Sequence, residues 1–119
     1  MREIIWAKYG EDAFNEILDY ITKNSGPINA GKVYEKVIGE IELLKSERVT
    51  TRKSQDLVNI GINDIFELHI NPWKVYYKII NDNKIVSIQQ IIDTRRNIEE
   101  LLVNLVIEKK IYVKVVEGR

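Results

Sequence analysis

The sequence predicts an α+β fold, in which a helical hairpin and a C-terminal helix pack on a small antiparallel sheet. Apolar residues recur with helical spacing in three segments, at 11–24, from about 29, and at 97–110. Strand-like apolar runs occupy residues 2–8, 65–70, 73–80 and 84–92. The last three runs are joined by short turns, which favours antiparallel pairing with the helices on one side. The predicted order is β-α-α-β-β-β-α.

The first 47 residues predict a strand followed by two helices. The run "REIIWAK" at 2–8 is apolar on both faces, so we expect a well-covered strand that is broken at Gly10. The stripe of the first helix is Phe14, Ile17, Leu18 and Ile21. The stripe of the second is Tyr34, Val37, Ile38, Ile41 and Leu44. The turn "SGP" at 25–27 is short, so the two helices form an antiparallel hairpin.

The remainder of the chain predicts a loop, a strand hairpin and a third helix. Residues 46–64 show no sustained period, so we expect a loop with little regular structure. Pro72 cannot donate to a ladder and marks a strand end or edge, and "NDN" at 81–83 is a hairpin turn. The stripe of the third helix is Ile98, Leu101, Leu102, Leu105 and Val106. The alternating tail "IYVKVVEGR" at 111–119 is a possible extra strand.

Strand alternation assigns the side chains of the hairpin to two faces. Val75, Tyr77 and Ile79 share one face, which we expect to be buried against Phe14, Ile17 and Ile41. Lys74, Tyr76 and Lys78 share the other. In the partner strand the more apolar face is Val86, Ile88 and Ile92. One face therefore packs on the helices, and we expect Arg95 and Arg96 at the rim of the open face together with Lys74.

Composition bounds the class of protein. A length of 119 residues predicts one domain, 1–119, and 45% apolar with 30% charged residues is ordinary for a soluble protein. The 18 basic and 18 acidic residues cancel, which argues against a globally basic nucleic-acid binder. There is no cysteine, which fits a reducing compartment. No apolar run approaches the roughly 18 residues of a membrane span, and no signal-type stretch develops at the start, so we expect a cytoplasmic protein.

The sequence lacks the residue patterns that metal sites and several common classes of enzyme require. His69 is the one histidine, and without cysteine it has no ligand cluster, so we expect no metal and no cofactor. None of the serines lies in a nucleophile-elbow motif, and the sequence has no second histidine that could act as a base. The acidic residues fall on helix surfaces and in turns, which does not support a paired-carboxylate hydrolase. No glycine-rich phosphate loop occurs.

The remaining signal is a set of cations around the hairpin. The candidate catalytic residues are Lys74, Arg95 and Arg96, and the candidate nucleic-acid-binding residues are Arg52, Lys53, Lys78 and Tyr76. Guanidinium groups bind phosphates through paired hydrogen bonds, and cations stabilise the extra charge of a phosphoryl-transfer transition state. A tyrosine can stack on a base. The alternative is an ordinary solvated sheet face and helix cap.

Three stretches in this order resemble the RelE/ParE superfamily of toxins from type II toxin–antitoxin systems. They are "EIIWAKYGEDAFNEILDYI", "ELHINPWKVYYKI" and "IIDTRRNIEELL", and the resemblance covers residues 3 to about 106. It implies the β-α-α-β-β-β-α fold, growth arrest by the free toxin, and a role in plasmid stabilisation. It also implies a cognate antitoxin, bound as an added strand or as an amphipathic helix against the helical hairpin.

The resemblance also assigns site residues by position. The strand arginine of the family falls on Lys74, which keeps the charge and loses the guanidinium fork. The arginine at the exit of the last strand falls on Arg95 or Arg96, and we favour Arg96. The ribonuclease branch has a tyrosine or histidine in or after the closing helix. Here Leu102 aligns with it, and Tyr112 is a substitute only if the tail folds back.

Three functions follow from this resemblance. The first is ParE-like inhibition of DNA gyrase, which does not need the missing tyrosine. The second is a RelE-like ribosome-dependent mRNA endonuclease, with the candidate cations on the phosphate and Lys53 or Lys78 as proton shuttle. The third is a degenerate member that only binds its partner. Neutral net charge disfavours the second, because a ribosomal RNA surface attracts basic proteins. We expect the first.

Overall fold

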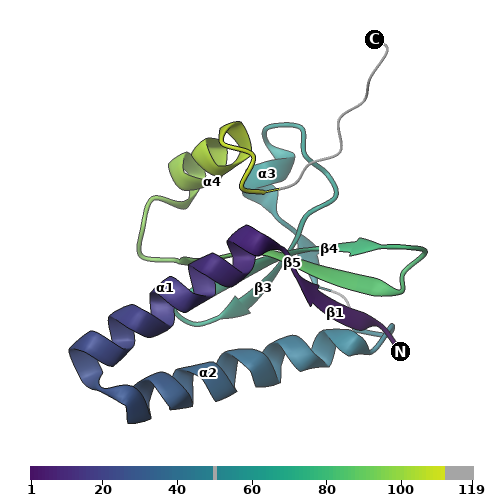
Figure 1. Ribbon diagram of the computed structural model, residues 1–119. Helices are drawn as coiled ribbons and strands as arrows, with labels where there is room; N and C mark the ends of the chain where they lie inside the picture. Colours follow the sequence, from purple (N-terminus) through teal and green to yellow (C-terminus); the bar gives the residue numbers. More distant parts are fainter. Residues whose placement is uncertain (50, 112–119) are drawn as a thin grey trace.

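The computed structural model describes residues 1–49 and 51–111, and it has a five-stranded mixed sheet with helices on both faces (Figure 1). In chain order the elements are β1 (Glu3–Trp6), α1 (Lys8–Ser25), α2 (Pro27–Glu42), the 3-10 helix η1 (Leu43–Lys45), β2 (Arg52–Lys53), α3 (Gln55–Val58), β3 (Phe66–Ile70), β4 (Trp73–Ile80), β5 (Ile85–Asp93) and α4 (Ile98–Ile107). The α+β class and the predicted order are confirmed, with β2 and α3 as additions. The predicted tail strand falls on residues 112–119, which lie outside the described residues.

The strand order is β1-β5-β4-β3-β2. Strands β3, β4 and β5 pair antiparallel, as predicted, and the additional strand β2 pairs antiparallel with β3. The prediction is wrong for β1, which pairs parallel with β5 over Ile85–Ile88. Parallel neighbours need a long crossover, and the chain between β1 and β5 supplies one that includes the helical hairpin. Because β1 ends beside Ile88, the second half of β5 extends past it.

The α1–α2 hairpin covers one face of the sheet (Figure 1). Phe14, Val37 and Ile41 are buried there against Val75 and Tyr77 of β4. The ring of Phe14 also stacks between those of Trp6 and Tyr34, with centroid distances of 5.3 and 5.9 Å. The predicted burial of Tyr77 and Val75 against the helices is therefore confirmed, and Ile79 and Ile17 are partly buried in the same cluster.

Gly10 lies inside α1, which begins at Lys8, and β1 has already ended at Trp6. The prediction that Gly10 ends the first strand is therefore wrong. It is buried where the first turns of α1 cross β5. A Cβ at this position would stand 2.6 Å from the carbonyl oxygen of Ile88. The absence of a side chain therefore lets the helix approach the strand backbone.

The second face of the sheet is covered too, which corrects the expectation of an open face. α3 and α4 lie over it, opposite the hairpin (Figure 1). Its buried cluster consists of Leu57, Ile65, Tyr76, Ile92, Leu102 and Ile111. The predicted stripe of the third helix supplies Leu102, with Ile98, Leu101, Leu105 and Val106 packed around it.

A bulge in β5 decides which side chains reach this second cluster. Tyr76 is opposite Gln90 but Tyr77 is opposite Ile88, so β5 supplies one more residue than β4 at this point. An added residue inverts the alternation beyond it. Ile91 therefore faces the hairpin and Ile92 faces α4, and the predicted grouping of Ile92 with Val86 and Ile88 is wrong.

Residues 46–64 hold more structure than their sequence predicts. β2 pairs with β3, and α3 is capped by Ser54, whose side chain accepts a hydrogen bond from the Leu57 amide at 3.4 Å. A two-residue strand and a four-residue helix are too short to show a period. None of the helices in residues 1–49 and 51–111 combines the length and the hydrophobicity that crossing a bilayer requires.

Arg2 joins the start of the chain to the segment at 44–49 and to the turn that contains Asn83. Its side chain is buried and donates to the carbonyl oxygens of Leu44, Ser46 and Val49 at 3.3, 3.2 and 3.0 Å. It also donates to Asn83, at 2.6 Å for the side-chain oxygen and 3.3 Å for the carbonyl. One guanidinium thereby satisfies acceptors from two separate turns, which a fork of five N–H donors can do.

Candidate functional site

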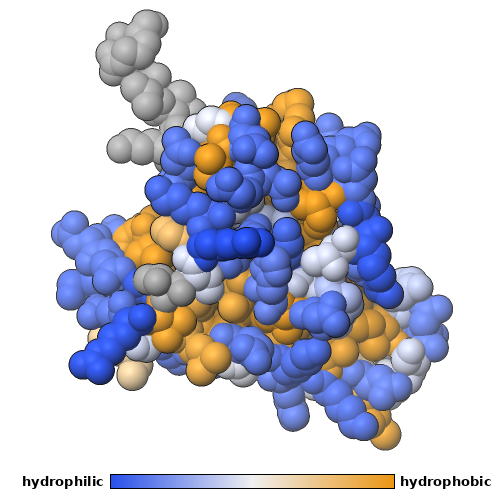
Figure 2. Space-filling model, turned by 180° about the vertical axis from the view of Figure 1, so that it is seen from behind, coloured by the Kyte–Doolittle hydropathy of each residue, from blue (hydrophilic) through white to orange (hydrophobic). Residues whose placement is uncertain are grey.

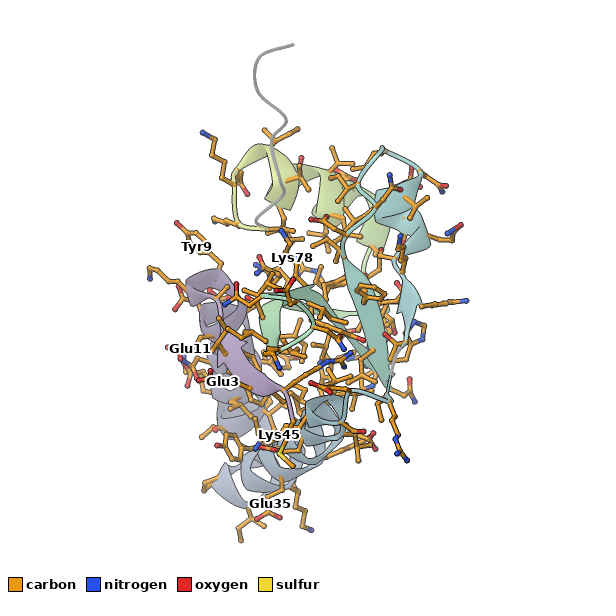
Figure 3. All side chains as sticks on the ribbon, turned by 90° about the vertical axis from the view of Figure 1, so that its right-hand side faces the viewer. Glu3, Tyr9, Glu11, Glu35, Lys45 and Lys78 are labelled. Atoms are coloured by element: carbon orange, nitrogen blue, oxygen red, sulfur yellow. The ribbon has the colours of Figure 1, made fainter. Side chains whose placement is uncertain are left out.

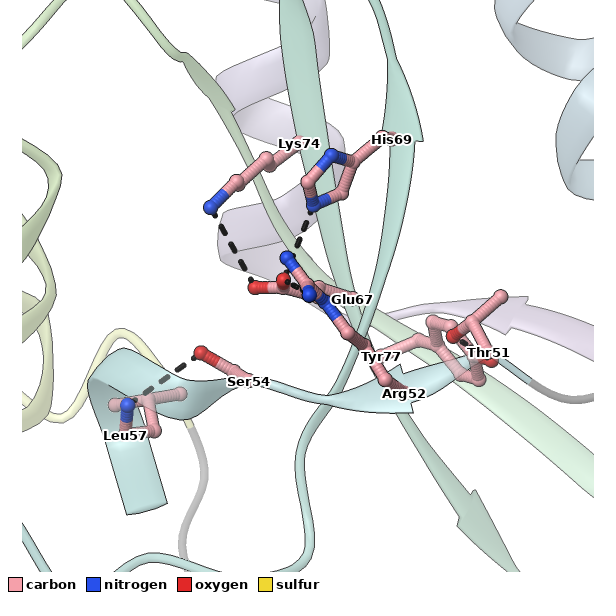
Figure 4. Close-up of polar contacts among 8 residues, drawn as sticks. All are labelled: Thr51, Arg52, Ser54, Leu57, Glu67, His69, Lys74 and Tyr77. Carbon is pink, nitrogen blue, oxygen red and sulfur yellow. Dashed lines mark hydrogen bonds and ion pairs between the residues drawn. The ribbon is translucent and has the colours of Figure 1, made fainter. Parts of the chain in front are cut away.

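Lys74, the predicted strand cation, lies beside a buried carboxylate (Figure 4). Its Nζ is 3.7 Å from Oε2 of Glu67 on β3. Arg52 Nε of β2 and His69 Nε2 both lie against Oε1 of the same carboxylate, at 3.1 and 3.0 Å. We call these four residues the Glu67 cluster. The carboxylate side chain is 2% exposed, whereas Arg52 and His69 are 71% and 50% exposed.

The sheet register explains why these side chains meet. Arg52 is opposite Glu67 across the β2–β3 ladder, and His69 is opposite Lys74 across the β3–β4 ladder. Glu67 and His69 are two residues apart on one strand, so they point to the same side. Directly opposed and diagonal side chains on one sheet face lie within contact distance. Four polar side chains from three strands therefore converge on one point.

Tyr76, predicted to stack on bases, is fully buried beneath α3 and α4. It is opposite Glu67 in the ladder, and its hydroxyl has no hydrogen-bond partner within the described residues. Burial raises the pKa of this hydroxyl, and the negative charges of Glu67 and Asp56 raise it further. The ring has no face available to a base, so the structure gives no support to the stacking prediction.

Lys78, the second strand lysine, is also enclosed. Its side chain is 7% exposed and its Nζ lies 3.1 Å from the carboxylate of Asp64. In Figure 3 it lies in the interior of the view, whereas Glu11 and Glu35 project from the helices into solvent. Lys53 differs from both strand lysines because it lies exposed on the edge strand β2, opposite Phe66. The predicted nucleic-acid-binding residues are therefore spread over different environments.

Arg95 and Arg96 are exposed in the turn after β5, where the sequence places them. Arg95 Nε donates to Oδ1 of Asp93 at 2.9 Å, and the Arg95 backbone amide donates to the same oxygen at 2.8 Å. These hydrogen bonds lower the pKa of the Asp93 carboxyl, and the charge of Arg96 lowers it further. Arg95 is thus engaged by its own turn. Lys74 is opposite Ile92 on the sheet face that α4 covers, so that face is not open as expected.

A groove of about 670 Å³ runs between α1 and α4 along the part of β5 that extends past β1. Tyr9, Ile17 and Tyr20 of α1 form one wall, and Leu101 and Leu105 of α4 form the other. Its further lining residues are Asp12, Ala13, Glu16, Ile21, Trp73, Gln90, Ile91, Ile92, Asp93, Arg95, Arg96 and Lys110. The groove thus combines apolar side chains on both walls with three basic residues (Arg95, Arg96 and Lys110) and three acidic residues (Asp12, Glu16 and Asp93).

The closing helix offers no acid–base group at the predicted position. Leu102 is 1% exposed and belongs to the buried cluster under α4. Tyr112, the conditional substitute, lies outside the described residues. Within the described residues, no group of three His, Cys, Asp or Glu side chains is arranged to hold a metal ion. The His69 ring nitrogen Nε2 lies 3.0 Å from Oε1 of Glu67.

Glu67 is the central residue of the Glu67 cluster, and it is not among the site residues predicted from the sequence. Its signal is present in "FELHI", where Glu67 and His69 alternate with the apolar Phe66, Leu68 and Ile70. Once β3 is aligned with β4 as a hairpin, these two polar residues fall beside Lys74 and Tyr76. This alignment places a carboxylate on the same face as the predicted cations, and it therefore indicates that a side chain of the protein itself neutralises them.

Comparisons with known proteins agree with this geometry. A family model described as "ParE toxin of type II toxin-antitoxin system, parDE" matches residues 4–98. No curated protein sequence matches the chain. A structure of the chromosomal ParDE toxin–antitoxin system from P. aeruginosa is 16% identical, with a TM-score of 0.65 over 78% of this chain and 96% of that one.

Two structures of the E. coli toxin RelE are also similar. A mutant in the free state is 13% identical, with a TM-score of 0.50 over 90% of this chain and 96% of that one. The isolated toxin is 13% identical, with a TM-score of 0.48 over 89% of this chain and 99% of that one. At such identities, the likeness to solved structures is one of fold.

Proposed function

This chain belongs to the ParE toxin family of type II toxin–antitoxin systems, and we propose that it arrests growth by inhibiting DNA gyrase when its antitoxin is absent. The inhibition is a binding event rather than a cleavage reaction. The observation that carries this proposal is that four of the predicted phosphate-binding cations, Arg52, Lys74, Lys78 and Arg95, are engaged by carboxylates of the chain itself.

Three ion pairs make this point. Lys74 is engaged by Glu67, Lys78 by Asp64, and Arg95 by Asp93. A nuclease needs cations aimed at the place where charge develops on the phosphate, without a competing anion between them. These side chains instead face carboxylates of the same chain. Two of the three cations, Lys74 and Lys78, lie on the sheet face that α3 and α4 cover. This arrangement supports protein binding over RNA cleavage.

The acid–base requirement points the same way. Cleavage of RNA needs a group within hydrogen-bond distance of the attacking or leaving oxygen, with a pKa near the working pH. Leu102 occupies the predicted position in α4 and is buried. Tyr76 is buried and its hydroxyl has a raised pKa, so it is a poor proton donor or acceptor at neutral pH. A gyrase inhibitor requires neither function.

We propose that the groove between α1 and α4 receives an amphipathic helix of the antitoxin. Such a helix lays its apolar face into a groove whose walls are apolar, here Ile17, Leu101 and Leu105. Acidic residues at its ends would meet Arg96 and Lys110. Apolar side chains also reach the surface elsewhere on the molecule, in several areas of the face shown in Figure 2. A partner that wraps the toxin would cover such areas.

Controlled expression in cells tests this function. Producing the toxin without its antitoxin should stop growth with signs of DNA damage, and primer extension on cellular mRNA should show intact transcripts. Co-production of the antitoxin should restore growth. Codon-phased mRNA cuts that vanish when Lys74, Arg95 and Arg96 are all replaced by alanine would instead establish an endonuclease. Normal growth with intact mRNA would identify a degenerate member that only binds its partner.

A further inference from the structure

We infer that Glu67 is the residue that closes this sheet face to nucleic-acid phosphates, and thereby directs the toxin to protein targets. This inference rests on the proposed function, since it explains why a cationic strand face does not act on RNA. It assigns a specificity role to a side chain that contacts no target. Removing the Glu67 carboxylate should create a binding site for single-stranded RNA that the natural protein lacks.

The cluster has the composition of a phosphate site with an anion already in it. Arg52 and His69 approach Oε1 of Glu67 at 3.1 and 3.0 Å, and Lys74 is 3.7 Å from Oε2. A carboxylate and a phosphate present similar oxygen pairs to a guanidinium. The Arg52 Nε–H and the His69 ring nitrogen are therefore already hydrogen-bonded to an anionic group, whereas Lys74 is held by charge alone, since Glu67 Oε2 has no hydrogen-bond partner within the described residues.

An incoming phosphate cannot easily replace this carboxylate. Glu67 is held on β3 between β2 and β4, and its side chain is 2% exposed, so it has no solvent-filled space into which it could swing. A group tethered beside its partners acts at a high effective concentration, against which a free ligand competes poorly. An RNA phosphate at Arg52 would also meet the negative charge of Glu67 directly behind the guanidinium.

The cations themselves are accessible from outside. Arg52 is 71% exposed and His69 is 50% exposed, while Lys74 is 18% exposed. A ligand can therefore approach the cluster from the β2 edge without moving α3 or α4. Charge neutralisation, rather than steric closure, is what excludes the phosphate. Glu67→Gln keeps the size and one acceptor oxygen of the side chain while removing its charge.

Fluorescence anisotropy with a labelled single-stranded RNA at low salt tests the inference. The Glu67→Gln variant should bind at least about tenfold more tightly than the natural protein, and its affinity should fall more steeply with salt, as expected for an added phosphate contact. The matched control is Glu35→Gln on the exposed surface of α2, which changes the net charge equally. It should leave RNA binding within about twofold of the natural protein. Adding Lys74→Ala to Glu67→Gln should remove most of the gain.

Equal gains in the Glu67→Gln and Glu35→Gln variants would overturn the inference, because net charge alone would explain them. No gain in a folded Glu67→Gln protein would overturn it as well. A thermal melt establishes whether this variant folds. The natural protein supplies a measurement that needs no variant. Titration with inorganic phosphate should leave the NMR signals of the Arg52 Nε–H and the His69 ring unmoved, and saturable shifts would contradict the role assigned to Glu67.

These outcomes are separate from those that test the proposed function. Cleavage of mRNA by the natural toxin would refute the gyrase proposal, whatever the Glu67→Gln variant binds. Failure of that variant to gain RNA binding would refute the role of Glu67 and leave growth arrest through gyrase untouched.

Discussion

Gly10→Ala should destabilise the protein, although Gly→Ala inside a helix ordinarily stabilises it by about 1 kcal/mol. The reason is the crossing of α1 over the bulge of β5. An added Cβ would stand 2.6 Å from the carbonyl oxygen of Ile88 and 3.0 Å from the carbonyl carbon of Gln89. Ordinary contacts of this kind measure 3.4–4 Å, and both neighbours are backbone atoms that cannot rotate away. Overpacking of this kind costs about 1–3 kcal/mol, which outweighs the gain in helix propensity.

Urea denaturation followed by circular dichroism measures the effect, and α2 provides matched controls. Gly31 and Gly39 are exposed helical glycines with no atom within 4 Å of an added Cβ. Gly31→Ala and Gly39→Ala should each raise the free energy of unfolding by roughly 0.5–1 kcal/mol. Gly10→Ala should instead lower it by up to about 2 kcal/mol, the difference between the overpacking cost and the gain in helix propensity. A Gly10→Ala protein as stable as the two controls would refute the close packing of α1 on β5.

Three further variants test other parts of the structure. Tyr77→Ala should lower the free energy of unfolding by roughly 3 kcal/mol or more, because the side chain is buried. Tyr77→Phe loses only the 2.7 Å hydrogen bond with Thr51 and should lower it by about 1 kcal/mol. A loss under about 1 kcal/mol for Tyr77→Ala in a denaturant titration would mean that the assigned face is wrong. Arg2→Lys should lower it by about 1–3 kcal/mol, because one ammonium cannot reach all the acceptors of the guanidinium; unchanged thermal unfolding would contradict the role of Arg2. The pKa of Asp93 is lowered by Arg95, so its stabilising contribution is present above its unfolded pKa near 3.8 and is lost as the pH falls through the folded value. Asp93→Asn should therefore be less stable than the natural protein at neutral pH and equally stable at low pH, and a difference that persists in acid would disprove this linkage.

Local periodicity was sufficient to predict the hairpin face of the molecule. The helical spacing of apolar residues in α1 and α2 is regular and includes Phe14, Val37 and Ile41. The strand alternation of Val75 and Tyr77 is also regular. All five residues belong to one buried cluster. Each repeat needs only the regular geometry of a helix or strand, and no knowledge of the neighbouring element.

The features that sequence reasoning missed depend on contacts between distant segments. The bulge in β5 inverts Ile92 relative to Val86, and nothing in "IVSIQQII" marks where the additional residue lies. The parallel pairing of β1 depends on which strand it meets after folding. Glu67 was read as part of an isolated strand, whereas its role follows from Arg52 on one side and Lys74 on the other. The sequence identifies the cationic residues, and their ion pairs with Glu67, Asp64 and Asp93 become visible once the strands are paired.

A supercoiling assay with purified DNA gyrase tests the central claim most directly. The claim is that this toxin acts by binding a protein target, because Lys74, Lys78 and Arg95 are engaged by its own carboxylates. The purified toxin should inhibit supercoiling of relaxed plasmid in a dose-dependent way, and stoichiometric antitoxin should restore it. Full gyrase activity in a molar excess of toxin, together with cleavage of mRNA on translating ribosomes by the same preparation, would contradict the account.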